Sequence, residues 1–186
     1  MTQTLTDRLK AIKNTPGSGE LAQVSEINAA FDKFDNHYIP ACKIWSSVDQ
    51  SIPNNVSTPI LYNATIFDTY AARAEGPMAD LSNDRITIRK PGLYMVHANM
   101  LANAGVAAGI MRLNIAINGT VNLSFFDPAP AAAQSQDLYG FYVLAANDLI
   151  TASCQQSQGS ARIYTNNTYQ NIFTLSAIWL GGNTEV

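Results

Sequence analysis

The chain has 186 residues, of which only 13% are charged and 47% are hydrophobic, and its formal net charge is -3. This length fits one domain with a small appendage. The charge excludes the dense Lys/Arg face that nucleic-acid binding requires, no apolar run approaches the ~20 residues that span a bilayer, and the N-terminus lacks the plan of a signal peptide. We therefore expect a soluble protein with no nucleic-acid partner and no membrane insertion. Because a soluble domain usually carries about 25% charged residues, we also expect some surface to be buried against other subunits.

Two short amphipathic helices are expected in residues 1–40. The first places Leu5, Leu9 and Ile12 on one face and ends at the turn 15–19. The second covers residues 20–35, and its apolar stripe contains Leu21, Val24, Phe31 and Phe34. Isolated helices of this length are marginal in water, so the stripe needs a surface to pack on. That surface is its own domain, a sister subunit or a larger assembly.

From Ala41 onward the hydrophobic pattern has the period of two that is typical of strands. The expected strands are residues 44–48, 60–67, 86–88, 93–101, 112–117, 121–126, 138–144, 149–154, 161–164 and 173–180. Asn118-Gly119 between two of them is the strongest hairpin signal. About ten short strands without intervening helices predict an all-β antiparallel sandwich or jelly roll over residues 41–186.

Three of these strands are apolar on both faces, namely 93–101, 138–144 and 173–180. A sandwich strand needs only one apolar face for its own core. A second apolar face is typical of a strand that is covered by another subunit. The pattern therefore predicts an oligomer.

Little catalytic chemistry is encoded. The two histidines are His37, at the end of the second expected helix, and His97, in mid-strand, and neither has a supporting motif. His97 alternates with apolar residues, which favours a core or interface role. No nucleophile elbow, phosphate loop, dinucleotide fingerprint or zinc-protease motif is present. We expect no catalytic residue, no cofactor and no enzyme activity.

Cysteines and carboxylates give no clear site. Cys42 and Cys154 form no C-x-x-C pair, so two reduced structural thiols are expected, and a bridge between them would need proximity that a sequence does not show. Loop carboxylates could bind calcium, but their spacing matches no EF-hand, so ordinary turn carboxylates and no metal are expected. These carboxylates are Asp80, Asp84, Asp127 and Asp148.

Four segments, in the right order, resemble the jelly roll of tumour necrosis factor and the complement globular heads. Residues 86–98 (ITIRKPGLYMVHA) resemble its signature hairpin, and 112–119 (RLNIAING) its next strand and turn. Residues 144–151 (LAANDLIT) match a later segment, with Asn147 in place of the usual Gly, and 173–180 resemble the terminal strand. The resemblance implies a ten-strand jelly roll that assembles as a homotrimer around a threefold axis.

The trimer contact is expected to use large aromatic side chains of these strands. The candidates are Tyr94, Tyr139, Phe141, Tyr142 and Trp179. Strand parity alone does not decide which of them face the axis.

Residues 19–41 resemble the anchoring segments of tailed-bacteriophage structural proteins. This resemblance implies a non-enzymatic virion protein made in the host cytoplasm: a capsid decoration, head-fibre or minor tail protein at the capsid surface or tail. Its partner would be the major capsid protein or another virion protein. The particle-anchoring residues would be Leu5, Leu9, Ile12, Leu21, Val24, Phe31 and Phe34.

The alternative is an adhesin with the same head that binds a host-surface glycan or receptor. Three residues near the C-terminal end are candidates for this surface recognition, namely Tyr164, Asn166 and Tyr169.

Overall fold

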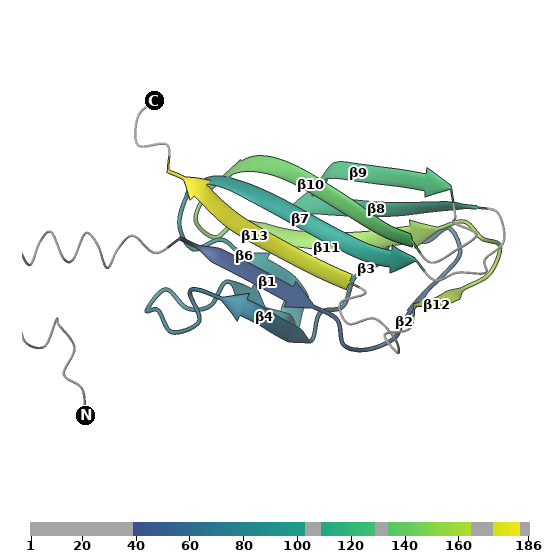
Figure 1. Ribbon diagram of the computed structural model, residues 1–186, viewed down its shortest axis with the longest axis horizontal. Coiled ribbons are helices and arrows are strands. Elements are labelled where there is room, and N and C mark those ends of the chain that lie inside the picture. The colour runs from purple at the N-terminus through teal and green to yellow at the C-terminus, as the bar shows by residue number, and fades with distance from the viewer. Residues whose placement is uncertain (1–38, 103–108, 129–133, 165–172, 183–186) are drawn as a thin grey trace, which may run out of the picture. The chain divides into compact units, whose positions relative to one another are not determined.

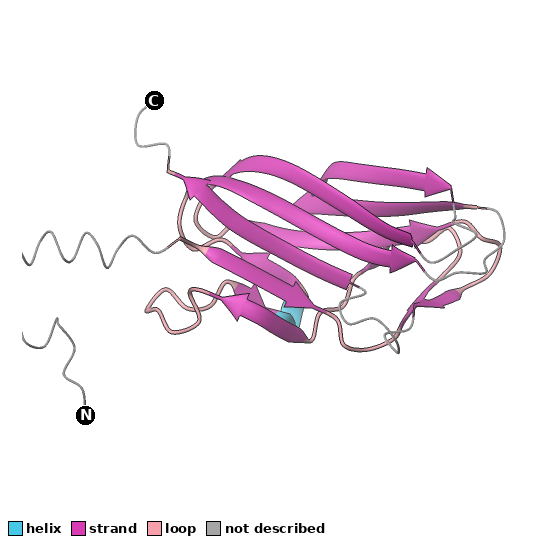
Figure 2. Cartoon of the chain, viewed as in Figure 1, coloured by secondary structure: helices cyan, strands magenta, loops and turns pink. Residues whose placement is uncertain are grey.

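The described chain consists of β-strands with one helical turn among them (Figure 2). The computed structural model describes residues 39–102, 109–128, 134–164 and 173–182. The first sheet contains, in spatial order, β10 (Gln134–Leu144), β7 (Gly92–Ala102), β13 (Phe173–Gly181), β1 (Ala41–Trp45) and β4 (Ala64–Asp68). The second sheet contains β5 (Ala79–Asp80), β6 (Arg85–Thr87), β11 (Leu149–Gln156), β8 (Ile110–Ile117) and β9 (Thr120–Pro128), and β3 (Thr58–Pro59) also pairs with β11. The short strands β2 (Gln50–Ile52) and β12 (Arg162–Tyr164) pair with each other, and the helical turn is η1 (Leu81–Asn83).

Neighbouring strands of the first sheet come from distant parts of the chain. β13, the last strand, lies between β7 and β1, and β10 pairs along the whole of β7 (Figure 1). All pairings between these strands are antiparallel. The two sheets form an antiparallel jelly-roll sandwich, so the predicted fold class is confirmed.

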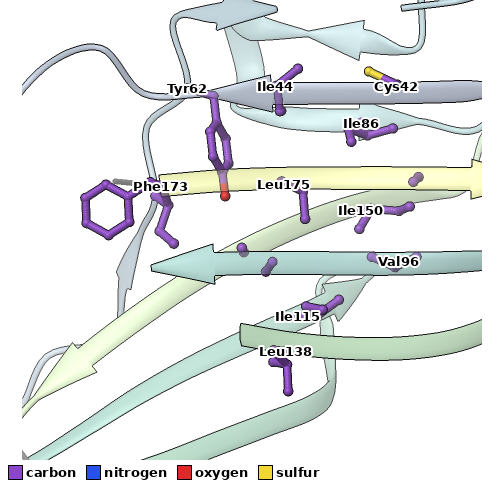
Figure 3. Packing of buried hydrophobic residues seen from close by; sticks show 14 of the residues in the cluster. Cys42, Ile44, Tyr62, Ile86, Val96, Ile115, Leu138, Ile150, Phe173 and Leu175 are labelled. Carbon is purple, nitrogen blue, oxygen red and sulfur yellow. The ribbon is translucent and has the colours of Figure 1, made fainter. Parts of the chain in front are cut away.

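The core fills the space between the two sheets, as the close view in Figure 3 shows. Strand β7 contributes every second residue to it, and these side chains are fully buried: Tyr94, Val96, Ala98 and Met100. The second sheet contributes a matching set from β8 and β11: Met111, Leu113, Ile115, Ile150, Ala152 and Cys154. Burial of one such large apolar side chain is worth about 1.5–3 kcal/mol, so this alternation is the main determinant of which face of each strand turns inward.

The turns use residues that tolerate a left-handed backbone. Asn118 and Gly119 have φ of 50° and 79° and join β8 to β9, as the sequence predicts. Asn147, which replaces the usual Gly between β10 and β11, has φ of 72°. Because Asn is among the few residues that adopt this region readily, the replacement preserves the turn.

Each of the ten expected strands overlaps a strand of the structure, but residues 60–63 are not a strand. The chain there passes from β3 in the second sheet to β4 in the first. The N–H groups of Ile60 and Asn63 donate to backbone carbonyls of the two sheets, whereas the two N–H groups between them bond to side chains. Gln50 Oε1 accepts a 3.1 Å hydrogen bond from the Leu61 N–H, and Asp84 Oδ1 accepts one of 2.6 Å from the Tyr62 N–H. β1 also begins at Ala41 and ends at Trp45, three residues before its expected range at each end.

Both cysteines are buried and unpaired, as expected. Desolvation raises the pKa of the Cys154 thiol to about 12. Desolvation, with a smaller contribution from the Asp68 carboxylate, also raises the pKa of the Cys42 thiol far above its ordinary value. The thiolate is the nucleophilic form of cysteine, so neither thiol is poised for chemistry near neutral pH.

Gly92, at the start of β7, is the glycine that the fold constrains most. Its φ of 150° is one that L side chains rarely adopt. A Cβ there would lie 2.2 Å from Trp179 Nε1 and 2.4 Å from the carbonyl oxygen of Gly181. The indole N–H of Trp179 instead donates a 3.2 Å hydrogen bond to the Pro91 carbonyl, which fixes the end of β13 against the turn before β7.

We expect Gly92→Ala to lower the free energy of unfolding by about 2 kcal/mol or more, because it combines backbone strain with a steric clash. The matched control is Gly119→Ala, since Gly119 has a positive φ but no atom within 4 Å of the added Cβ. The control should cost only about 1 kcal/mol. Denaturant unfolding at equal protein concentration measures both, and equal losses for the two variants would contradict the role assigned to the Trp179 contact.

Candidate subunit interface

The side chains of β10, β7 and β13 that point away from the core form a surface that we call the outer face. Its apolar half consists of Leu93, Met95, Phe141, Val143 and Ile178. Its polar half consists of His97, Asn99, Ser135 and Asp137 with the buried Thr174 and Ser176 beside them, and Tyr139 lies at the border. The strand registers align these residues in rows, for example Phe141 opposite Met95 and Met95 opposite Ile178.

The outer face is most exposed along β10. Phe141 is 66% exposed, Val143 74% and Tyr139 55%. The residues that alternate with them along β10 point toward the core. Single exposed apolar residues are normal, but three consecutive outward positions on one strand, next to a half-exposed Leu93, form a continuous patch. Such a patch is typical of a surface that another protein covers.

The polar half is organised around the carboxylate of Asp137. Its Oδ1 lies 2.9 Å from His97 Nε2 and accepts a 2.9 Å hydrogen bond from Asn99 Nδ2, and its Oδ2 accepts one of 3.0 Å from the Ser135 hydroxyl. Partial burial alone would raise the pKa of Asp137, but these hydrogen bonds and the charge of His97 outweigh it. The pKa of the Asp137 carboxyl therefore lies below its ordinary value.

His97 is held from a second side by an aromatic ring. The imidazole stacks on the ring of Tyr139 with centroids 4.2 Å apart and an angle of 14° between the planes. Its side chain is only 16% exposed. The ring is therefore fixed in place before any partner arrives.

The outward side of the second sheet has a different character. Small polar side chains there bond to one another: Asn114 Nδ2 donates to the Ser153 hydroxyl at 3.2 Å, and the Ser124 hydroxyl donates to Asn114 Oδ1 at 2.7 Å. A hydrogen-bonded surface of this kind is stable in water. The centre of this side therefore differs from the outer face of the first sheet, whose exposed side chains on β10 are mainly apolar.

The structure separates the five aromatic residues expected at the trimer contact. Tyr139 and Phe141 lie on the outer face. The expectation is wrong for Tyr94, which is fully buried and donates a 2.7 Å hydrogen bond from its hydroxyl to the Lys90 carbonyl. Tyr142 and Trp179 share its side of the sheet and pack, partly buried, against the core of their own chain.

Sequence reasoning missed the non-aromatic members of the outer face. Val143 and Leu93 complete the apolar half, and Asp137 joins His97 to Asn99. The signal available in the sequence was that residues 139, 141 and 143 are alternate positions of one strand and therefore lie on the same face of β10. It could be interpreted only with knowledge of how β10 pairs with β7.

The remaining expected site residues have other outcomes. Residues 1–38, with all seven anchoring residues, lie outside the described residues, as do Asn166 and Tyr169. Tyr164 is the last residue of β12. The described turn carboxylates bind within their own neighbourhoods: Asp80 Oδ2 contacts Arg85 Nε at 2.8 Å, and Asp148 Oδ2 accepts from the Ala145 N–H at 2.8 Å. In the part of the chain that the structure describes, no helix is long and apolar enough to cross a membrane.

No protein-family model and no curated protein matches this sequence. Solved structures match it over most of its length. The globular domain of a zebrafish complement 1qA protein is 16% identical, with a TM-score of 0.52, over 77% of this chain and 99% of that one. The structure of Eiger TNF from S. frugiperda is 10% identical, with a TM-score of 0.54, over 79% and 96%. The crystal structure of murine APRIL at pH 5.0 is 14% identical, with a TM-score of 0.53, over 77% and 100%.

At these identities the likeness establishes the fold. The jelly roll that the four sequence segments indicate is therefore confirmed from strand order and from structural similarity alike. The resemblance of residues 19–41 to bacteriophage anchoring segments receives no support from these matches. The chain thus has the fold of the tumour-necrosis-factor and complement globular heads.

Proposed function

We propose that the chain is a non-catalytic head that assembles into a homotrimer through the outer face of its first sheet. The observation that carries this proposal is the exposed row Tyr139, Phe141 and Val143 beside the half-exposed Leu93. A non-catalytic role is supported by the buried thiols and by His97, whose imidazole is engaged by Asp137 and Tyr139.

A closed ring requires two complementary patches on each copy, because each copy contacts one neighbour with one surface and the other neighbour with a different one. The outer face supplies the first patch. The second is the neighbouring edge of the second sheet, where β9 leaves Val121 54% exposed and Phe125 39% exposed. We propose that this edge of one copy packs on the outer face of the next.

Phe141→Asp should convert the trimer to a monomer, because it places a charge on the apolar half without touching the core. The matched control is Val56→Asp, which changes a residue of similar exposure (51%) in the connection between β2 and β3, away from the outer face. Light scattering on the full chain should give three chains for the unaltered protein and the control, and one chain for Phe141→Asp. A trimer that survives Phe141→Asp would contradict the proposed face.

We further propose that this head is a virion structural protein, docked by residues 1–38 as a capsid decoration or head-fibre protein, or else as a minor tail protein. The support is the resemblance of residues 19–41 to phage anchoring segments and the expected apolar stripe with Leu21 and Phe31. The docking partner would be the major capsid protein or another virion protein. Binding to assembled particles would stabilise them by mass action.

Deletion of residues 1–38 should leave a folded trimer that no longer associates with particles. The deletion retains Pro40, because its carbonyl accepts a 2.8 Å hydrogen bond from the Trp179 N–H. Particles from cells that supply either the full or the shortened chain are purified and their protein content is compared. The full-length double variant Leu21→Asp, Phe31→Asp should behave like the deletion, and normal incorporation of both chains would contradict the anchoring role.

The alternative, a glycan- or receptor-binding adhesin, is favoured by one observation. A hollow of about 170 Å³ on the second sheet combines the apolar Ile110 with polar side chains of Asn55, Arg112, Gln155 and Ser157. Gln156 also lines it, but its amide is buried and bonds within the chain. Amide and guanidinium groups bind hydroxyls through directed hydrogen bonds. The same trimer would then use this hollow for recognition.

The adhesin alternative predicts that the trimer binds members of a glycan array and that Gln155→Ala weakens this binding at least several-fold. The mass of the trimer should stay unchanged. Phe141→Asp serves as the comparison, since it should abolish only the avidity that comes from trimer formation. No binding by the intact trimer to any glycan would argue against the glycan-binding form of this alternative.

A further inference from the structure

The border between the two halves of the outer face contains a titratable pair. His97 lies under the ring of Tyr139, and its Nε2 is 2.9 Å from Asp137 Oδ1. Both residues are on the side of the sheet that the proposed trimer covers. The pair is partly exposed in the single chain, with His97 at 16% and Asp137 at 40%.

The charged surroundings of His97 on the outer face are simple. β10 contributes Asp137 and Tyr139, and β13 contributes Ser176 in register with His97 and no titratable group. The next charge along the same row is Lys43 on β1, which is in register with Ser176 and therefore lies two strands away from His97. Asp137 is thus the charge in contact with the imidazole.

Histidine is the side chain whose charge changes between about pH 5 and about pH 8. The hydrogen bonds from Asn99 and Ser135 help to keep the Asp137 carboxylate ionised over that range. With a protonated imidazole the pair has no net charge, and with a neutral imidazole it has a net charge of minus one. Protonation of one nitrogen therefore decides whether the outer face carries an uncompensated carboxylate.

We propose that trimer formation takes up protons at His97, so that the assembly is stronger in mildly acidic solution than in mildly basic solution. This inference rests on the proposed function, because it needs a second copy on the outer face. Covering the face removes water, and an uncompensated buried charge costs far more than a neutral pair.

The direction follows from linkage. In this proposal the assembled state binds more protons than the separate chains, so the association constant rises as the pH falls and decreases as the pH rises. A difference of one unit in proton affinity between the two states corresponds to about a tenfold change in association per subunit.

The test is the monomer–trimer equilibrium of the full chain, measured by analytical ultracentrifugation between about pH 5.5 and about pH 8. The chain contains only two histidines, so a His37→Gln background leaves His97 as the single one. In that background, association should be about tenfold or more stronger at the acidic end. If the trimer does not dissociate at accessible concentrations, exchange of subunits between two differently labelled trimers replaces the equilibrium, and exchange should be faster at the basic end.

Two variants separate this mechanism from a general effect of pH. His97→Gln should remove the dependence. Asp137→Asn should reverse its sign, because a protonated imidazole would then be the uncompensated charge. Circular dichroism of each variant checks the fold.

The outcomes distinguish the inference from the proposed function. A monomer at every pH and concentration would overturn both. A trimer whose association is independent of pH, or an Asp137→Asn variant that keeps the original direction, would overturn the role of His97 and leave the trimer in place.

Discussion

The register of β7 with its two neighbours decides which side chains the sandwich uses and which it leaves outside. Tyr94, Val96, Ala98 and Met100 fill the core, so the residues between them must point away from it. β10 pairs with β7 over eleven residues, so residues that are opposite each other point to the same side of the sheet. Tyr139 and Phe141 are opposite outward residues of β7 and therefore point outward as well. A slip of one residue would exchange the two sets, which is why the core and the outer face are a single property of this sheet.

The outward surfaces of the two sheets differ in chemical character. On the second sheet, Asn114, Ser124 and Ser153 satisfy one another and need no partner. In the proposed trimer, the apolar half of the first sheet would supply affinity and the polar half direction, since the hydrogen bonds around Asp137 restrain His97 and Asn99 in the single chain. Preorganised polar groups of this kind reduce the ordering cost of association.

Sequence reasoning could predict the fold because each local signal agreed with the others. Alternation marked the strands, and Asn118-Gly119 marked the β8–β9 hairpin. It failed at residues 60–63, where the chain crosses between the sheets and side chains of Gln50 and Asp84 accept the two middle N–H groups, which no local pattern reveals. The outer face was predicted only in part for the same reason: Tyr94 and Phe141 are both large aromatic residues of strands, and only the pairing of distant strands shows which is buried.

The position of β1 has a mechanical consequence. β1 lies between β13 and β4, hydrogen-bonded to both, and the segment before it continues to the N-terminus. Tension applied to that segment along the strand loads the bonds of two ladders together in shear, instead of opening them one at a time. A head tethered through residues 1–38 would therefore resist unfolding from its N-terminal strand, because both ladders of β1 must break together.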